Sequence, residues 1–451
     1  MLPYAPLHHV LLTDAGVTLV MTSGNVSDEP IAYRDEDAVA RLAEIADLFV
    51  SHDRPIETRT DDSVARVVGG AQVMVRRSRG HVPEPLPLPL DCGRPMLACG
   101  AELKNTFALS KGATAWVGHH VGDLKNYETL LSFQRGIEHF RRLFAVSPEL
   151  VIHDLHPDYL STKHALELGL EPVGVQHHHA HLAACLAEHG ETGSAVGAIF
   201  DGTGYGGDGT IWGGELLFGD LRAFDRVGFL LPVRMPGGEA AIRQPWRMAC
   251  AWLAAAGADV PALGVDHADW ERVAGLARSG TASPLTTSAG RLFDAVAAIC
   301  GLVSHVNYEG QAAVELEAAI DADERDRYPL PLRDDGAGPL VLDPRPTLWW
   351  IAAERAGGVP VPTIAARFHN AVAAATARAC ERAADRHGAD AVVLSGGVFQ
   401  NRHLLEATGV LLRAAGLRVL IPQLLPPNDG AIAYGQLAVA AARLRAGDVR
   451  A

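Results

Sequence analysis

The sequence predicts an α/β protein whose two lobes enclose a ligand, with a smaller α/β part in front of them. Apolar segments with the length of buried strands alternate along the chain with segments of helical spacing. Two glycine clusters, at 202–209 and 396–397, each follow a predicted strand and lie far apart in the sequence. A nucleotide held between two lobes needs one such turn from each lobe, so we expect a duplicated fold around a nucleotide.

The composition narrows the class of protein. Of the 451 residues 48% are hydrophobic and 20% charged, which is ordinary for a soluble enzyme with a large core. The 53 acidic and 39 basic side chains give a net charge of -14, so we do not expect nucleic acid as a partner. The 6 cysteines form no CxxC pair, and no apolar run is long enough to cross a bilayer. We therefore expect a cytoplasmic protein that does not associate with a membrane.

A proline-rich stretch at 81–95 divides a short leading part from a long body. We place the leading part at 1–88, a linker at 89–95 and the body at 96–451. The first lobe is expected at about 96–192 together with the C-terminal helix, and the second lobe at about 193–425. The leading part is small for an α/β domain and is therefore expected to be incomplete.

Periodicity gives the expected elements. In the leading part we expect a buried strand at 17–25, a helix at 35–50 and a strand at 72–77. In the body we expect strands at 96–100, 106–112, 114–120, 150–155, 194–202, 215–219, 391–397 and 418–423, and helices at 161–170, 177–190, 363–388 and 431–447.

The most specific motif is a histidine cluster at the start of a predicted helix. His177 and His181 are four residues apart, so their imidazoles stand one turn apart on the same helical face and can share one metal ion. A carboxylate has to complete the site, and Asp429 is the best candidate because it lies in a tight turn that opens another helix. Iron, zinc and magnesium all remain possible. The alternative is a polar helix start without a metal.

The first glycine cluster follows a strand that ends at Asp201. Its glycines allow backbone N–H groups to approach phosphate oxygens, and Asp201 is able to hold a magnesium ion or to polarise a water molecule. The expected cofactor contacts here are Gly202, Thr203, Gly204, Tyr205 and Gly206. A β-hairpin without a ligand is the alternative.

The second glycine cluster again leads from a strand into a helix. Gly396 and Gly397, with Asn401 beyond them, are expected to approach the adenosine and its phosphates. On its own this glycine pair is weak evidence for nucleotide binding. It becomes stronger evidence because the sequence also contains the first glycine cluster and the Asp429 turn.

Scattered cationic and polar groups complete the candidates. Lys104 and Arg243 suit an anionic substrate such as a carbamoyl phosphate group, although each suits a structural salt bridge as well. In the leading part, the donors expected to cradle a triphosphate are Ser23, Asn25, Ser63 and Arg79. Ordinary turn chemistry is the alternative for these four.

Several long motifs together resemble the HypF family, the carbamoyltransferases that mature nickel–iron hydrogenases. TSGNVSDEPIA, TDDSVARV and RRSRGHVPEPL are similar to the second half of a YrdC-like domain. The family's last domain is resembled, in order, by GAELKNTF, GHHVGDL, HDLHPDY, QHHHAHLAA, FDGTGYGGDGTIWGGE, PGGEAAIRQPWRMA, GRLFDAVAA, YEGQAAVELE, LSGGVFQNRHLL and NDGAIAYGQ.

The resemblance implies a fold and a reaction. The fold is the two-lobed actin-like fold of the sugar-kinase and heat-shock superfamily, called ASKHA, after a partial YrdC-like domain. Carbamate derived from carbamoyl phosphate is adenylated with ATP, and the carbamoyl group of carbamoyl-adenylate passes to the C-terminal cysteine of HypE for cyanide ligand synthesis. The family's metal positions fall on His177, His181 and Asp429, and its nucleotide contacts fall on the 201–209 hairpin and on Gly396 and Gly397. As catalytic residues we expect Asp201, Lys104 and Arg243.

The sequence also departs from the family pattern. The acylphosphatase-like domain, the zinc-finger region and the first half of the YrdC-like domain are not represented in it. Carbamate adenylation is therefore not assured for this chain alone. Two other functions stay open: an O-carbamoyltransferase for small molecules of the antibiotic or nodulation type, and a nucleotide-binding scaffold or tRNA-modification subunit.

Overall fold

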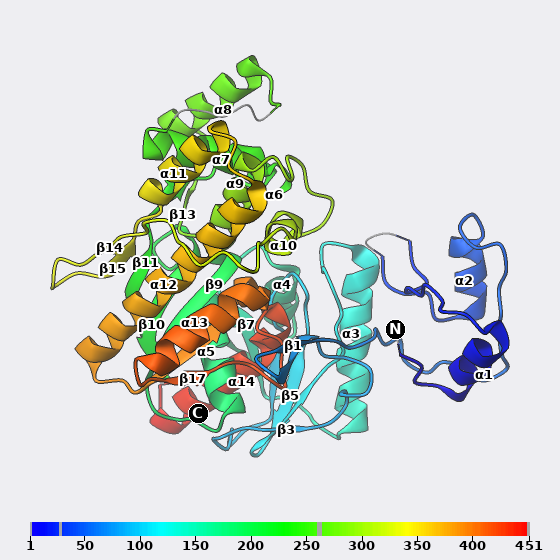
Figure 1. Cartoon of the computed structure of the whole chain (residues 1–451). Helices are drawn as coiled ribbons and strands as arrows, with labels where there is room; N and C mark the ends of the chain where they lie inside the picture. Colours follow the sequence, from blue (N-terminus) through cyan, green and yellow to red (C-terminus); the bar gives the residue numbers. More distant parts are fainter. Residues whose placement is uncertain (1, 27–28, 259–263, 449–451) are drawn as a thin grey trace.

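The structure is a computed structural model that describes residues 2–26, 29–258 and 264–448. Its body has two lobes, each built on its own β-sheet (Figure 1). Helix α5 (His177–Glu188) packs on the sheet of the second lobe, and α14 (Ile432–Ala446) packs on that of the first. Because α5 and α14 also pack against each other, the two lobes share one apolar layer. The predicted two-lobed α/β architecture is confirmed.

The first lobe has a six-stranded sheet in the order β3-β6-β5-β4-β7-β8. Its strands are β3 (Leu86–Pro87), β4 (Met96–Ala98), β5 (Ala108–Lys111), β6 (Thr114–Val117), β7 (Leu150–Asp154) and β8 (Glu171–Val175). Helix α3 (Tyr127–Leu143) covers the sheet face opposite α14, and its apolar residues pack there in a cluster around Phe107. Helix α4 (Leu160–Glu167) follows β7. β3 lies inside the predicted proline-rich stretch and pairs with β6 at the edge of the sheet, where proline is tolerated.

The second lobe has a nine-stranded sheet whose long path runs β14-β15-β11-β10-β9-β16-β17. Its strands are β9 (Ala195–Tyr205), β10 (Ile211–Gly219), β11 (Phe224–Leu230), β12 (Val233–Arg234), β13 (Leu285–Thr286), β14 (Leu332–Arg333), β15 (Leu340–Leu342), β16 (Ala391–Ser395) and β17 (Arg418–Leu420). The central strands β9 and β16 are parallel, and Ser395 pairs with Ile199. Both glycine clusters therefore leave the sheet at the same edge.

Helices of the second lobe surround this sheet and extend beyond it. They are α6 (Ala240–Arg243), α7 (Pro245–Ala256), α8 (His267–Ser279), α9 (Ala289–Ile299), α10 (Gln311–Ala318), α11 (Arg345–Ala356), α12 (Val361–His387) and α13 (Arg402–Ala414), with 3₁₀ turns η1 (Gly397–Gln400) and η2 (Asp429–Ala431). Within the described residues, no helix combines the length and the apolar character that crossing a bilayer requires.

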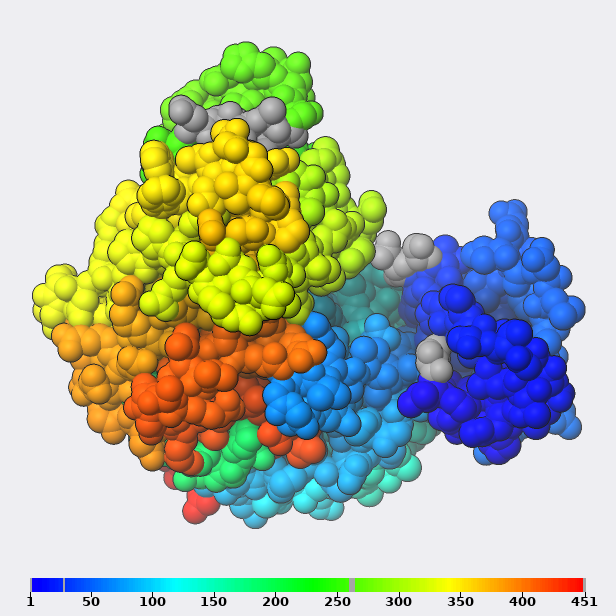
Figure 2. Space-filling view, in the orientation of Figure 1, coloured from blue at the N-terminus to red at the C-terminus, as the bar shows by residue number. Residues whose placement is uncertain are grey.

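The portion of the leading part that contains α1 and α2 projects from the body as a separate bulge (Figure 2). It contains α1 (Pro6–Ala15), α2 (Asp35–Leu42) and the antiparallel hairpin of β1 (Val64–Val68) and β2 (Ala71–Arg76). Neither α1 nor α2 has a buried residue. Other segments of the leading part contact the body: β1 contacts α13, β3 pairs with β6, and the Arg59 side chain donates a hydrogen bond to the hydroxyl of Ser132 in α3.

One expected element of the leading part is wrong. Residues 17–25 were predicted as a buried strand, but they form no strand, and Val17 and Val20 are exposed. A strand needs a neighbour to receive its backbone hydrogen bonds, and no described segment runs beside this one. The predicted helix at 35–50 is also shorter, since α2 ends at Leu42.

The contact between α5 and α14 is closest at Gly435. A Cβ atom at this position would lie 1.9 Å from the carbonyl oxygen of Ala180. We predict that Gly435→Ala lowers the free energy of unfolding by about 1–3 kcal/mol, because the helices have to separate. The weakened packing should also reduce metal binding by α5. Urea unfolding and a metal titration measure the two effects.

The matched control is Gly275→Ala in α8, where an added Cβ meets no atom within 4 Å. This change should raise the free energy of unfolding by about 0.5–1 kcal/mol, since alanine favours a helix. Equal stability of the two variants would contradict the packing argument.

Candidate functional site

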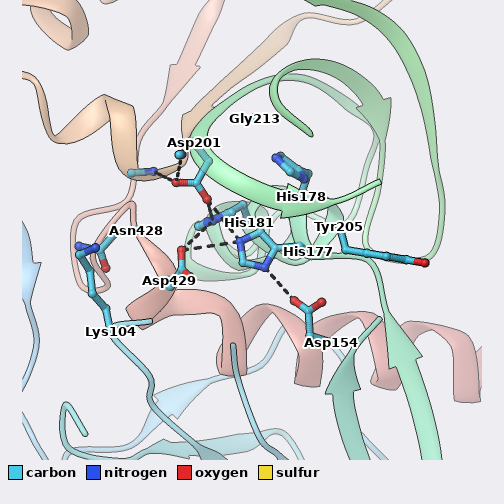
Figure 3. Close-up of polar contacts among 12 residues, drawn as sticks. Lys104, Asp154, His177, His178, His181, Asp201, Tyr205, Gly213, Asn428 and Asp429 are labelled. Carbon is cyan, nitrogen blue, oxygen red and sulfur yellow. Dashed lines mark hydrogen bonds and ion pairs between the residues drawn. The ribbon is translucent and has the colours of Figure 1, made fainter. Parts of the chain in front are cut away.

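Four side chains from three segments of the chain point toward one another next to β9 of the second lobe (Figure 3). His177 and His181 lie on α5, Asp201 on β9, and Asp429 begins η2. One ligand atom from each lies within 4.8 Å of the others. The Nε2 atoms of His177 and His181 are 3.3 and 3.4 Å from Oδ2 of Asp201, and 3.6 and 3.7 Å from Oδ1 of Asp429. The predicted metal residues are thus brought together, and Asp201 joins them.

Local capping explains why these side chains point inward. The Gln176 side chain caps α5 by accepting a hydrogen bond from the backbone N–H of His179. The Asn428 side chain accepts in the same way from Gly430 at the start of η2. His178 and His179 turn elsewhere: a Cβ on Gly204 would meet the His178 ring, and Nε2 of His179 is 2.8 Å from the carbonyl oxygen of Asp220.

Asp154, at the end of β7, orients one of the imidazoles. Its Oδ2 atom is 2.8 Å from Nδ1 of His177, and both side chains are buried. With Nδ1 donating to Asp154, the lone pair of Nε2 faces the centre of the cluster, as in many metal sites. By sequence alone, Asp154 is only a polar residue at the end of a predicted strand.

The charges of the cluster suit a cation. Burial opposes a charge on His177, but Asp429 and Asp154 outweigh it and hold the pKa of that imidazole well above its usual range. Burial would also raise the pKa of Asp201, yet the two histidines hold it well below its usual range. Neither ring nitrogen of His181 has a hydrogen-bond partner among the described residues, although the side chain is buried. Two imidazoles and two carboxylates around an orphaned nitrogen fit a divalent transition metal.

The two glycine clusters meet at Asp201. Its Oδ1 atom accepts hydrogen bonds from the backbone N–H of Gly202, at 2.8 Å, and of Gly397, at 3.2 Å. Gly396 has a φ of 99°, and a Cβ there would lie 2.2 Å from the carbonyl oxygen of Phe200. Only glycine fits this position, so the close approach of the second turn to β9 depends on it.

A cleft opens in front of this cluster between α9, α10, η1 and the β1–β2 hairpin. Of the predicted site residues, it is lined by Lys104, Asp201, Gly202, Gly397, Asn401 and Asp429. Its cations are each paired with a carboxylate: Lys104 with Glu309, Arg291 with Asp294 and Arg66 with Glu317. Lys104 adopts a φ of 45°, which is uncommon for lysine and is a type of strain that clusters at functional sites.

Other predicted residues lie outside this cleft. Thr203, Gly204 and Tyr205 continue β9, so the turn expected directly after Asp201 begins only at Gly206, and Tyr205 reaches His156 rather than the cleft. Arg243 ends α6, is exposed and does not line the cleft, so its position gives no support to a catalytic role. Asp201 was predicted as a catalytic residue, but here it faces the same centre as the metal residues.

The predicted donors of the leading part lie apart from the metal cluster. Ser23 and Arg79 line one pocket together with Tyr4 and Asp62. Asn25 accepts a hydrogen bond from the Ser23 hydroxyl, and Ser63 donates to the carbonyl oxygen of Arg79. A triphosphate site formed by these four residues stays a prediction.

Sequence reasoning missed several residues that line the cleft. Asn428 and Arg66 were not singled out as contributors to it. By sequence alone, Glu309 and Glu317 fit an inner helix face and a solvated one equally well. Their positions in the sequence could have indicated some of these residues. Asn428 immediately precedes Asp429, and the two glutamates are eight residues apart in a segment that includes α10.

The fold and the site define a class. It is a two-lobed α/β protein with a cleft between its elements, and at the base of the cleft two histidines and two aspartates are able to hold a metal ion.

Comparisons with known proteins place the chain within this class. Residues 197–436 match the family model described as "Carbamoyltransferase, Kae1-like Domain, second subdomain", and residues 91–188 match "HypF Kae1-like domain". Residues 1–78 match the model for Sua5, YciO and YrdC, described as "Telomere recombination". The chain belongs to the HypF carbamoyltransferase family.

Individual relatives agree along nearly the whole chain. Carbamoyltransferase HypF of Synechocystis sp. is 40% identical over 97% of this chain and 59% of its own length, and that of Rhizobium leguminosarum is 41% identical over 98% and 58%. A crystal structure of full-length HypF in a phosphate- and nucleotide-bound form is 39% identical, with a TM-score of 0.93 over 98% of this chain and 70% of that one. The chain thus spans less than two thirds of the length of these curated relatives.

The orienting role of Asp154 gives a prediction. Asp154→Asn should weaken the affinity for a divalent metal about 10- to 100-fold, because the neutral amide no longer fixes and polarises His177. Equilibrium dialysis against Zn²⁺ with metal analysis measures this change. Asp158→Asn is the control, since the Asp158 side chain is 82% exposed and pairs only with Lys163 at 3.6 Å. Identical metal affinities of the two variants would remove Asp154 from the site.

Proposed function

We propose that this chain transfers a carbamoyl group from carbamoyl-adenylate to the C-terminal cysteine of HypE, a step in the synthesis of the cyanide ligand of nickel–iron hydrogenases. The carbamoyl-adenylate is made from carbamoyl phosphate and ATP. The observation that carries the proposal is the cluster of His177, His181, Asp201 and Asp429 at the base of a cleft lined by glycine turns and cations. Relatives called carbamoyltransferase HypF support the reaction class.

The residues of the cleft suit an adenylate. Gly202 and Gly397 leave room for a ligand next to the carboxylate of Asp201, because neither carries a side chain. Lys104 supplies a positive charge, and Glu309 together with Asp429 outweighs burial to raise its pKa. Lys104 therefore stays charged and is able to bind the phosphate of AMP once Glu309 moves aside.

The metal site has a defined place in this chemistry. His177, His181, Asp201 and Asp429 would hold the ion, which when bound supplies positive charge for phosphate or ribose oxygens. In the transfer itself, the thiolate of the acceptor cysteine forms a bond to the carbamoyl carbon, and the bond from that carbon to the AMP oxygen breaks. AMP leaves with the electron pair, and the product is an S-carbamoyl cysteine.

The direct test is a transfer assay. The purified metal-loaded chain is mixed with synthetic carbamoyl-adenylate and HypE, and HypE is weighed by mass spectrometry. The expected result is the added mass of one carbamoyl group on the C-terminal cysteine, which a HypE variant without that cysteine does not gain. An unchanged HypE mass would overturn the proposal, and AMP release only with sugar or antibiotic acceptors would favour a small-molecule O-carbamoyltransferase.

The lysine of the cleft gives a second prediction. Lys104→Met should weaken AMP binding about 10- to 100-fold, since a charge-assisted hydrogen bond is lost and Glu309 is left unpaired. Glu309→Gln should instead strengthen AMP binding, because the ammonium group is then free. Isothermal titration with AMP measures both variants. Lys111→Met, at an exposed end of β5, should leave the affinity unchanged. Weaker AMP binding by Glu309→Gln, or unchanged AMP binding by Lys104→Met, would contradict this role for the ion pair.

A further inference from the structure

The hairpin of β1 and β2 belongs to the leading part of the sequence but packs on the second lobe (Figure 1). Val68 and Val73 are buried in the apolar core of that lobe. The backbone N–H of Gly69 donates to Oε1 of Glu406 on α13, at 2.8 Å. The hairpin is thus anchored independently of the exposed helices α1 and α2.

Arg66, in β1, connects the hairpin to the edge of the cleft. Its guanidinium donates to the carbonyl oxygen of Gln400, at 2.9 Å, and to Oε1 of Glu317, at 3.0 Å. Gln400 ends η1, whose first residue is Gly397, and the Gln400 amide donates to the Gly397 carbonyl oxygen at 3.1 Å. Arg66 therefore holds the 397–400 turn, which follows β16, through the carbonyl group of its last residue.

A second link runs through Asn428. Its amide nitrogen donates to the carbonyl oxygen of Val75, at 3.0 Å, and to Oε1 of Gln400, at 2.9 Å. Its oxygen accepts from the N–H of Gly430, at 3.0 Å. Asn428 is buried and adjacent to Asp429, so one side chain joins the hairpin, the Gly397 turn and the turn that bears a metal residue.

We propose that the β1–β2 hairpin is a working part of the nucleotide cleft, with Arg66 as a positioning residue that fixes the 397–400 turn for the nucleotide. This inference rests on the proposed function, because it takes the ligand to be an adenylate. Arg66 and Val75 also line the cleft themselves. The cleft of the last domain is accordingly completed by a segment from the part of the chain that matches the YrdC-type family model.

Arg66 is not needed to hold the β1–β2 hairpin on the second lobe. The buried Val68 and Val73 already anchor the hairpin, whereas the Arg66 side chain is 41% exposed and forms an ion pair of the kind that adds little to stability. Loss of Arg66 should hence leave the fold intact and act on the 397–400 turn.

The test compares Arg66→Gln with Arg222→Gln, whose arginine pairs with Asp448 and does not line the cleft. Titrations with AMP and, separately, with Zn²⁺ are run on the full chain, and thermal unfolding is followed in parallel. Arg66→Gln should weaken AMP binding about tenfold and leave the Zn²⁺ affinity and the unfolding temperature like those of Arg222→Gln. Arg66→Lys should restore part of the AMP affinity.

Each other outcome has a distinct meaning. Equal AMP affinity of the two glutamine variants would overturn the role of Arg66 while leaving the proposed function in place. A joint fall of AMP affinity, Zn²⁺ affinity and unfolding temperature would make Arg66 a structural residue and also overturn the inference. Failure of the unaltered chain to bind AMP would overturn the proposed function, and the inference with it.

Discussion

The carboxylate of Asp201 is the constraint on which the rest of the site depends. One of its oxygens faces the two imidazoles of α5, and the other accepts hydrogen bonds from the backbone N–H of Gly202, within β9, and of Gly397, after β16. This double use is possible only because β9 and β16 are parallel neighbours, with their carboxyl ends at one edge of the sheet. It also requires α5 to lie against that sheet, which the packing of α14 behind it secures. A shift of any one of these elements would separate the cluster.

The parts of this arrangement that are local in sequence were predictable. His177 and His181 follow from helical spacing, and the strands and glycine turns follow from apolar runs that end in glycine. Asp429 could be chosen because a turn that begins a helix is a recognisable pattern, and the resemblance to HypF pointed to the same residue. The orientation of Asp154 toward His177 needs two segments of the first lobe to meet, and no local pattern contains that information.

The errors have the same origin. Residues 17–25 have the composition of a strand, but a strand forms only beside a partner, and none of the described segments supplies one. Arg243 is a separate case, because it does not line the cleft and its catalytic role stays a prediction. Only the second strand of the hairpin was predicted, at 72–77, and the attachment of the hairpin to α13 depends on packing between segments more than 300 residues apart.

The return of α14 to the first lobe also bears on how the protein is made. This helix is the last one in the described chain, and the turn carrying Asp429 immediately precedes it. During synthesis on the ribosome, α5 emerges long before the helix that covers it and before one of the carboxylates it faces. The cluster of His177, His181, Asp201 and Asp429 consequently comes together only after the segment that bears Asp429 has left the ribosome, more than 240 residues after α5.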